Sequence, residues 1–563
     1  MTFDVSLPLI PIFTKPEPVY MRKLTCLLSS VFLFAFAFSQ DAKNLPTDYL
    51  SKEFHAGRRE ALRQLMPPNS VAVIFAYPER VFSQDVDYTY HQNPDLYYFS
   101  GYSEPRSVLF IFKDQQTTAD NKKYNELFFI QQKDPLQESW TGRRMGVAKV
   151  KSELGFDMVF DGAEFKNFTL DFSKFDQILL ENLPWAENDA SDSADLFDLV
   201  SQFKQKVGFP KDYNRDVENA LGYFVQYGNL QNLHYFTDDL KKVIASGEAS
   251  GQYTVADQLS LQDIVDIKDQ NGLDKAKEKL KVKKVNTSLY NNYVASLREI
   301  KTPEELKLLA KAVNISSMAH AEVMKAIQPG MSEHELQGIF EFVHKKYGAE
   351  EEGYPPIVGA GNNGCILHYE ENSNTNFGND MVLMDVAAEY HGYSADVTRT
   401  VPSTGKFTAE QKAIYDLVYK AQEEVFKLCK EGSTFKATEN KATEILADGL
   451  VQLGIIKNKN EVKTYYPHGC SHFIGLDVHD KGHYQKLVAN MAITVEPGIY
   501  IPPNSPCDKK WWGIAVRIED DILITKEGYE LLSKYAPRKS EDVEKMIAQK
   551  SALNDFVLPK IPE

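Results

Sequence analysis

The chain has 563 residues, with 63 Lys and Arg against 79 Asp and Glu, a net charge of −16, and only five cysteines. That charge excludes a nucleic-acid binder that relies on electrostatic attraction, because little basic surface is left to neutralise phosphates. Five cysteines are too few for a disulfide scaffold. Hydrophobic residues make up 43% of the chain, which is typical of globular proteins, and the length allows about two to four domains.

Residues 1–39 are interpreted as a leader that precedes the folded protein. Met21-Arg22-Lys23 opens a short basic segment, 24–38 is almost continuously apolar, and Ala37-Phe38-Ser39 offers small residues at a cleavage position. This pattern predicts a signal peptide that begins at Met21 and an exported protein, either periplasmic or secreted. An N-terminal membrane anchor and a lipoprotein at Cys26 are the alternatives. The mature chain has no further apolar run of about 20 residues, so no membrane span is expected in it.

Residues 40–300 are predicted to form an N-terminal α/β domain. Short β-rich runs at 71–75, 97–101, 107–112 and 126–130 alternate with turn signals and are read as strands. From about 186 to 290 the composition becomes polar, with helical patches such as 196–207. We interpret this stretch as an insertion with solvated helix faces, and no chemistry is assigned to it.

Residues 301–545 are predicted to form an α+β domain, followed by a tail at 546–563. Thr302-Pro303-Glu304-Glu305 is a capping box that opens a helix ended by Pro329-Gly330. Further helices are predicted from Ser332 to Gly348, from Thr408 to Gly432, and over about 437–454. Strand-like stretches lie at 381–389, 393–401, 492–501 and 514–525. Two helices and then strands therefore occur twice, which indicates a duplicated layout with helices covering a curved antiparallel sheet.

Two aspartates around a probable turn are the first candidates for chemistry. With a hairpin centred between Tyr390 and His391, Asp385 and Asp396 would lie opposite each other, with Cβ atoms about 5 Å apart. Two buried carboxylates at that distance repel unless a cation lies between them or one is protonated. A metal site is one interpretation, and capping of backbone amides at the turn is the other.

More ligand types follow in the same region. Glu519 lies in a strand-like run two residues after Arg517, on the same face, and Glu496 ends another apolar strand. Three imidazoles, of His468, His472 and His479, occur within twelve residues. Four carboxylates and one imidazole would suit two divalent ions, Mn²⁺ best, with Zn²⁺ or Co²⁺ as alternatives. The remaining polar residues of the region are interpreted structurally: His391 and His483 as surface or core residues, and Cys470 as a small buried filler rather than a zinc ligand.

The set Asp385, Asp396, His472, Glu496 and Glu519 resembles the five-ligand dinuclear site of the pita-bread metallopeptidases, family M24. The strings DVAAEYHGYSADVTRT (385–400), HGCSHFIGLDVHD (468–480), TVEPGIYI (494–501) and RIEDD (517–521) are similar to the aminopeptidase P branch, and more distantly to prolidase. DLYYFSGYSEP (95–105) and WTGRRMG (140–146) resemble the N-terminal domain of that branch, which is creatinase-like. The resemblance covers about 50–150 loosely and 300–535 well.

Carried over position by position, the resemblance implies that Asp396 and Glu519 bridge two metals, that Asp385 binds one of them, and that His472 and Glu496 bind the other. It implies that His368 contacts substrate, that His479 stabilises the tetrahedral intermediate, and that His468 and Arg517 support the ligands. Glu496 is expected to shuttle the proton. The segment between His479 and Glu496 is shorter than in the family, so a loop arginine of the family has no counterpart.

The activity implied is hydrolysis of the bond between a peptide's first residue and a proline by a metal-bridging hydroxide. Prolidase, which cleaves only dipeptides, is the alternative; a methionine aminopeptidase would not need the N-terminal domain, and a binding module that kept only the fold would usually lose ligands. The partners expected are peptides with proline at the second position and a second copy of the chain, in a homodimer or homotetramer.

Overall fold

The computed structural model describes residues 46–555 except 119, 185–194, 210–220, 222–223, 225–227, 231–232, 251–260 and 282–283. The predicted signal peptide and residues 556–563 of the predicted tail lie outside these residues. Contacts separate a unit that ends at Tyr49 from one that begins at Leu50, and all elements below belong to the second unit. Within the described residues, no helix combines the length and the apolar character that a membrane crossing requires.

A six-stranded mixed sheet organises the N-terminal domain. Its strand order is β6-β5-β4-β1-β7-β8, with β1 antiparallel to β4 and parallel to β7. The strands are β1 (Ser70–Phe75), β4 (Val108–Thr117), β5 (Lys123–Ile130), β6 (Val159–Asp161), β7 (Gln177–Leu180) and β8 (Val285–Asn286). A small hairpin, β2 (Val81–Ser83) and β3 (Val86–Asp87), lies outside this sheet.

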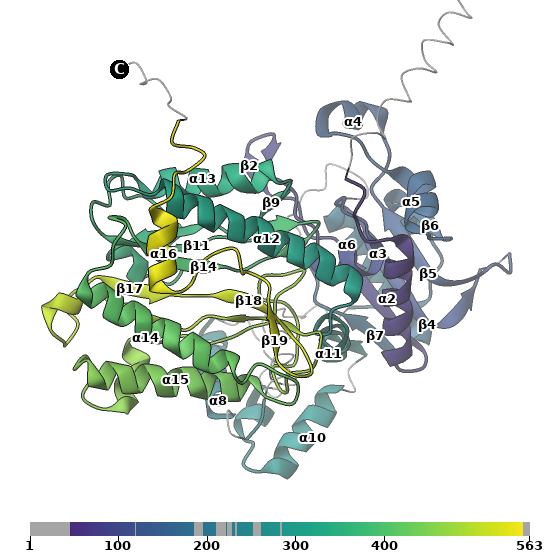
Figure 1. Ribbon diagram of the computed structural model, residues 1–563. Helices are drawn as coiled ribbons and strands as arrows, with labels where there is room; N and C mark the ends of the chain where they lie inside the picture. The colour runs from purple at the N-terminus through teal and green to yellow at the C-terminus, as the bar shows by residue number, and fades with distance from the viewer. Residues whose placement is uncertain are drawn as a thin grey trace, which may run out of the picture. The chain divides into compact units, whose positions relative to one another are not determined.

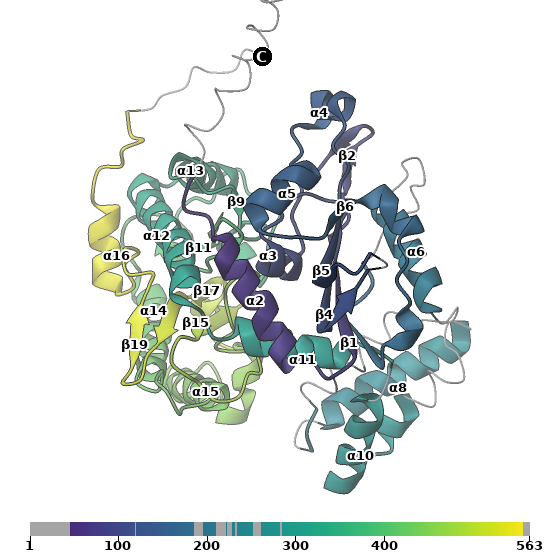
Figure 2. The same cartoon turned by 90° about the vertical axis from the view of Figure 1, so that its right-hand side faces the viewer.

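Helices cover both faces of this sheet, as Figure 2 shows. One face packs against α2 (Lys52–Leu65), α3 (Pro94–Ser100), α5 (Gly146–Leu154) and α11 (Thr287–Arg298), and the other against α6 (Leu196–Val207). Side chains alternate between the two cores along β1, since Ala72 and Ile74 belong to one and Val71 and Val73 to the other. Helix α6 therefore covers the second face of the sheet, although its sequence falls in the predicted insertion.

The run 97–101, predicted as a strand, is helical, and that prediction is wrong. Asn93 caps α3 through its side chain, which accepts from the amide of Asp95, and Pro94 occupies the first turn. A capping Asn followed by Pro is a helix start signal. The aromatic residues that suggested a strand instead pack in the core between sheet and helices, as Tyr98 and Phe99 show.

Helix starts in residues 301–545 agree with the capping signals. Thr302 and Glu305 form the reciprocal capping box of α12 (Pro303–Ala326), and Ser332 and Glu335 that of α13 (Glu333–Lys346). Thr408 caps α14 (Ala409–Phe426), which ends six residues earlier than predicted, and the fourth helix is α15 (Phe435–Gln452). The two helix pairs lie on either side of the strands (Figure 1), and both contribute to one hydrophobic core. Helix α16 (Ser540–Ile547) packs on the same core through Val543.

Each of the four strand-like stretches is present but interrupted. The first is split into β11 (Met381–Asp385) and β12 (Ala388–Tyr390), and each of the other three is also split into two strands. Strand partners change at each break: β11 pairs with β10 (Ile357–Ala360) and β14, whereas β12 pairs with β9 (Glu351–Glu352) and β13. The remaining strands are β13 (Tyr393–Ser394), β14 (Thr398–Pro402), β15 (Ala492–Val495), β16 (Gly498–Ile501), β17 (Ile514–Arg517), β18 (Asp520–Ile524) and β19 (Tyr529–Leu531).

Candidate metal centre

The breaks in the strands place the four predicted carboxylate ligands. Asp385 is the last residue of β11, Asp396 lies between β13 and β14, Glu496 between β15 and β16, and Glu519 between β17 and β18. A continuous strand would send successive side chains to opposite faces of one sheet. The breaks release these residues from the regular pleat, and all four side chains line one cavity of about 370 Å³.

The hairpin register predicted for the two aspartates is wrong by two residues. The turn is centred on His391 and Gly392, both with positive φ, so Tyr390 pairs with Tyr393 and Asp385 lies opposite Thr398 rather than Asp396. A two-residue turn with positive φ at both positions matches the twist of the strands, which favours this register. The two carboxylates are nevertheless neighbours, because the hydroxyl of Tyr354, whose single hydrogen they can share, lies 2.5 Å from Asp385 Oδ1 and 2.8 Å from Asp396 Oδ1.

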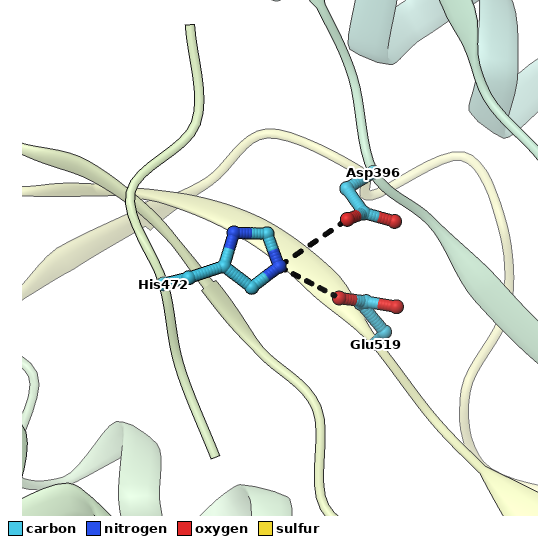
Figure 3. A group of neighbouring side chains, drawn as sticks. All are labelled: Asp396, His472 and Glu519. Atoms are coloured by element: carbon cyan, nitrogen blue, oxygen red, sulfur yellow. Dashed lines mark ion pairs between the residues drawn. The ribbon is translucent and has the colours of Figure 1, made fainter. Parts of the chain in front are cut away.

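His472 supplies the imidazole that faces the carboxylates. Its Nδ1 lies 2.9 Å from the carbonyl oxygen of Phe473, which can only accept, so Nδ1 carries a hydrogen. Nε2 then points into the cavity, 3.3 Å from Asp396 Oδ2, 3.4 Å from Glu496 Oε1 and 3.9 Å from Glu519 Oε1. Figure 3 shows the ring directed at Asp396 and Glu519. Among the described residues, one ligand atom each from Asp396, His472 and Glu519 lie within 4.8 Å of one another.

Electrostatics shows that acidic groups outnumber basic ones in the cavity. Burial raises the pKa of Asp396, and the charge of Asp385 adds to this; burial likewise raises the pKa of Glu519 well above its usual value and that of Glu496 to about 7. For Asp385 burial acts in the same direction, but the guanidinium of Arg517 at 2.6 Å outweighs it and lowers the pKa. The guanidinium of Arg517 and the imidazole of His472 therefore face four carboxylates.

A divalent ion fits this deficit. Glu519 Oε1 is buried and has no hydrogen-bond partner among the described residues, which is costly for a carboxylate unless a cation meets it. Burial opposes protonation of His472, yet its contacts with Asp396 and Glu496 raise its pKa to about 9. A metal ion would take the place of the Nε2 proton. The donor set, rich in oxygen with one imidazole, suits Mn²⁺ or Zn²⁺.

The other predicted site residues line the same cavity, namely His368, His468, His479 and Arg517. His468 Nδ1 faces the carbonyl oxygen of Gly469, and Nε2 lies 2.8 Å from the hydroxyl of Tyr500. Burial, together with Arg517, lowers the pKa of His468 to about 3. His479 stacks edge-on against His472, with ring centroids 4.4 Å apart, and burial lowers its pKa to about 4. Both rings are therefore neutral near pH 7.

Three supporting residues, Thr398, Tyr500 and Tyr354, were not among the predicted site residues, although the first two lie in the strings 385–400 and 494–501. Arg517 is held by the hydroxyl of Tyr500 at 2.9 Å and by Thr398 Oγ1 at 3.1 Å, and Thr398 in turn donates to Glu519 Oε2 at 2.7 Å. Tyr354 lies in a Gly-Tyr-Pro-Pro loop that matches no motif. Such residues can be found only through their contacts, because a lone hydroxyl in a sequence has many possible roles.

The residues interpreted as structural lie outside the cavity. His391 is buried in the turn and pairs with Glu350, and His483 pairs with Glu299 at 2.9 Å. Cys470 is buried, and burial raises the pKa of its thiol well above the usual value. None of the three lines the cavity.

Comparison with known proteins identifies two family regions. Residues 307–526 match the model of metallopeptidase family M24, and residues 55–177 match the N-terminal domain of aminopeptidase P. The chain is 32% identical to an Xaa-Pro aminopeptidase of Escherichia coli, covering 88% of this chain and 98% of that protein. It is 28% identical to the mitochondrial intermediate cleaving peptidase 55 of Arabidopsis thaliana, covering 88% and 83%.

A solved structure agrees with these matches. Aminopeptidase P from E. coli with the inhibitor Pro-Leu is similar with a TM-score of 0.66 and 30% identity, over 89% of this chain and 98% of that chain. The similarity includes both the N-terminal region and the catalytic region. The chain belongs to metallopeptidase family M24 and has the pita-bread fold of its aminopeptidase P branch.

Proposed function

We propose that the protein is an Xaa-Pro aminopeptidase that removes the first residue of peptides whose second residue is proline. The observation that carries this proposal is the cavity in which five ligand-type side chains converge beside three further imidazoles. Two relatives named as Xaa-Pro aminopeptidases match this chain over 98% of their own length. Apolar side chains of Ile357, Leu367 and Val478 line the same cavity and offer the kind of surface against which a proline ring packs.

The metal ligands in this proposal are Asp385, Asp396, His472, Glu496 and Glu519, holding two divalent ions, with Mn²⁺ as the first choice. When held there, two such ions would supply an activated water and would polarise the scissile carbonyl. His479 is neutral, so one of its ring nitrogens carries a hydrogen that it can donate to the developing oxyanion. His368 contacts the substrate, and Glu496 accepts the proton of the nucleophile and delivers it to the leaving nitrogen.

Cleavage assays of the purified, Mn²⁺-loaded protein test the reaction. The tripeptide Arg-Pro-Pro should be cleaved after arginine, and an Xaa-Pro dipeptide should be a poorer substrate. Cleavage of the dipeptide alone would indicate a prolidase. Absence of both cleavage and metal binding would indicate a binding module and would contradict the proposal.

The ligand assignment is tested by Asp396→Asn. Since Asp396 lies between Asp385, Tyr354 and His472, the neutral amide should abolish metal binding and turnover together. Metal content by elemental analysis and turnover of Arg-Pro-Pro give the two readouts. Asp85→Asn, at an exposed position in the β2–β3 turn, is the matched control and should change neither. Full activity in Asp396→Asn would refute the assignment.

We further propose export through the segment 21–39. N-terminal sequencing of the protein from its native host should then start at Gln40. A mature protein that retains Met21 in the cytosolic fraction would contradict export.

A homo-oligomer is also proposed. Exposed apolar side chains occur on the β2–β3 hairpin and on α4 (Pro135–Thr141), among them Phe82, which is 63% exposed, and Trp140, which is 87% exposed. Apolar surface of this kind is typical of interfaces. Light scattering of the purified protein should give a dimer or tetramer, and a monomer at micromolar concentration would contradict this proposal.

A further inference from the structure

A buried ionic cluster lies directly behind the loop that carries His479. Arg298, the last residue of α11, bonds Asp95 Oδ1 at 2.7 Å and also pairs with Asp480. Lys301 bonds the second oxygen of Asp480 at 2.8 Å. Lys481 reaches back to Asp95 Oδ2 at 2.7 Å. The N-terminal domain and the catalytic loop thus share one set of ion pairs.

The cluster is balanced in charge, and four of its six members are deeply buried, whereas Lys481 and Glu181 are partly exposed. A third carboxylate, of Glu181 after β7, pairs with Lys481 at 2.6 Å, so three acidic groups face three basic ones. Asp95, Arg298, Lys301 and Asp480 are all at most 2% exposed. A buried ion cluster is weak evidence for stability, because apolar residues of the same volume often serve as well. Its role is better sought in the geometry that it imposes.

That geometry concerns His479. After His472 the loop folds back on itself, so that the amide of Asp480 donates to the carbonyl oxygen of Phe473 at 3.0 Å. His479 therefore stands between two constraints: its own amide bonds Asp477 Oδ1 at 3.1 Å, and the next two side chains enter the ionic cluster. Gly475 packs closely against this part of the loop, since an added Cβ there would lie 2.1 Å from Asp480 Oδ2.

The loop is attached mainly to α11 on this side. Beyond Lys481, His483 donates its amide to Glu299 Oε2 at 3.0 Å, and its Nε2 lies 3.1 Å from Asn292 Oδ1. Helix α11 is itself fixed against the N-terminal sheet, since Tyr290 and Val294 belong to the core that also contains residues of α2 and α3. The position of α11 therefore constrains the position of the loop through ion pairs and hydrogen bonds.

We propose that the N-terminal domain positions His479 over the metal cavity through Asp95, Arg298, Asp480 and Lys481. These four are positioning residues: none of them lines the cavity, and they act through the imidazole that does. The inference rests on the proposed function, in which His479 donates to the oxyanion. Loss of the cluster should therefore lower the rate of the chemical step and leave metal binding intact.

Lys481→Met is the variant that tests this, because it removes the link to Asp95 and Glu181 while Arg298 still neutralises Asp95. Since small misplacement of a catalytic group can cost up to a hundredfold in rate, kcat should fall about 10- to 100-fold. KM and metal content should remain unchanged. Lys481→Arg, which keeps the charge, should restore most of kcat.

Glu181→Gln is a second, milder variant in case Lys481→Met does not fold, and it should lower kcat in the same direction. The matched control is Glu126→Gln, which breaks an ion pair of the buried Arg59 within the N-terminal domain, away from the loop. It should leave kcat unchanged.

A double-mutant cycle with His479→Ala separates positioning from a general structural effect. If the cluster acts through His479, Lys481→Met should lower kcat in the wild type but not in the His479→Ala background. An equal loss in both backgrounds would overturn the inference.

Crystal structures of the metal-free wild type and Lys481→Met provide a readout that does not depend on turnover. In the wild type, the ring centroids of His479 and His472 should lie 4.4 Å apart, and in Lys481→Met this distance should change. An unmoved ring would overturn the inference even if the enzyme cleaves Arg-Pro-Pro. A moved ring in a protein that cleaves no Xaa-Pro peptide would instead uphold the positioning and refute the proposed function.

Discussion

At the scale of single residues, hydroxyl groups hold the ligand-type carboxylates of the site. The hydroxyl of Tyr354 lies within hydrogen-bond distance of both Asp385 and Asp396, and Thr398 donates to Glu519. Thr398 holds Glu519 Oε2 and leaves Oε1 without a partner among the described residues, whereas Asp385 is held through both oxygens, because Arg517 donates to its Oδ2. Partners of this kind typically change metal affinity by large factors when they are removed.

Tyr354→Phe should therefore weaken metal binding about 10- to 100-fold without unfolding the protein. The hydroxyl is the only group removed, and two carboxylate oxygens lose the one hydrogen that they share. Metal titration by calorimetry gives the affinity directly.

The control is Tyr415→Phe, since Tyr415 is also buried and its hydroxyl donates to the carbonyl of Arg538 at 2.6 Å, remote from the cavity. This control should cost about 1 kcal/mol of stability and leave metal affinity unchanged. Unchanged affinity in Tyr354→Phe would show that the two aspartates do not need the hydroxyl.

At the scale of elements, local signals were reliable for helix starts and less so for strands. Thr302, Ser332 and Thr408 each begin a helix where the capping pattern predicts one, because a cap is formed by residues three positions apart. The aromatic run in 97–101 was misread as a strand, since aromatic residues fit both a pleated surface and a helix packed on a core. Strand breaks could not be predicted, because they depend on which strand pairs on each side.

Thr302→Ala should lower the free energy of unfolding by about 1 kcal/mol, since the side chain of Thr302 accepts from the amide of Glu305 at the start of α12. Urea denaturation followed by circular dichroism measures this. The exposed Thr375 offers a control, and Thr375→Ala should stay within about 0.5 kcal/mol of the wild type. Equal stability of all three proteins would mean that the cap contributes nothing.

At the scale of the whole molecule, the N-terminal domain and the catalytic domain share a core. Leu62 and Tyr98 of the first belong to the same hydrophobic cluster as Ala388, Tyr393 and Ile474 of the second. Polar contacts of α11 with the 480–483 loop extend this interface toward the cavity. Because residues hundreds of positions apart meet here, no local pattern indicates it.

One of these contacts should depend on pH. The hydrogen bond with Glu299 raises the pKa of His483 above its usual value, although burial opposes this. The group gains protons on folding, so its stabilisation is complete below the unfolded pKa of about 6.5 and is lost as pH rises through the folded pKa. The stability difference between wild type and His483→Gln should therefore be larger at about pH 6 than at about pH 8.5.

Urea denaturation at the two pH values measures that difference. His334→Gln, at an exposed position in the first turn of α13, is the control and should show no comparable trend. A difference for His483→Gln that grows with pH would contradict the assigned ion pair.

The sequence by itself determined the kinds and order of the candidate ligands, the starts of α12, α13 and α14, and the family resemblance, because residue type and capping are properties of a few neighbouring positions. It predicted Asp385, Asp396, His472, Glu496 and Glu519 as one site, and all five line one cavity. Only the tertiary structure decided how they meet. The register of the hairpin, the strand breaks, Tyr354, and the link from Asp95 to Lys481 depend on pairing between distant segments, whose free energy is not encoded in any short stretch of the chain.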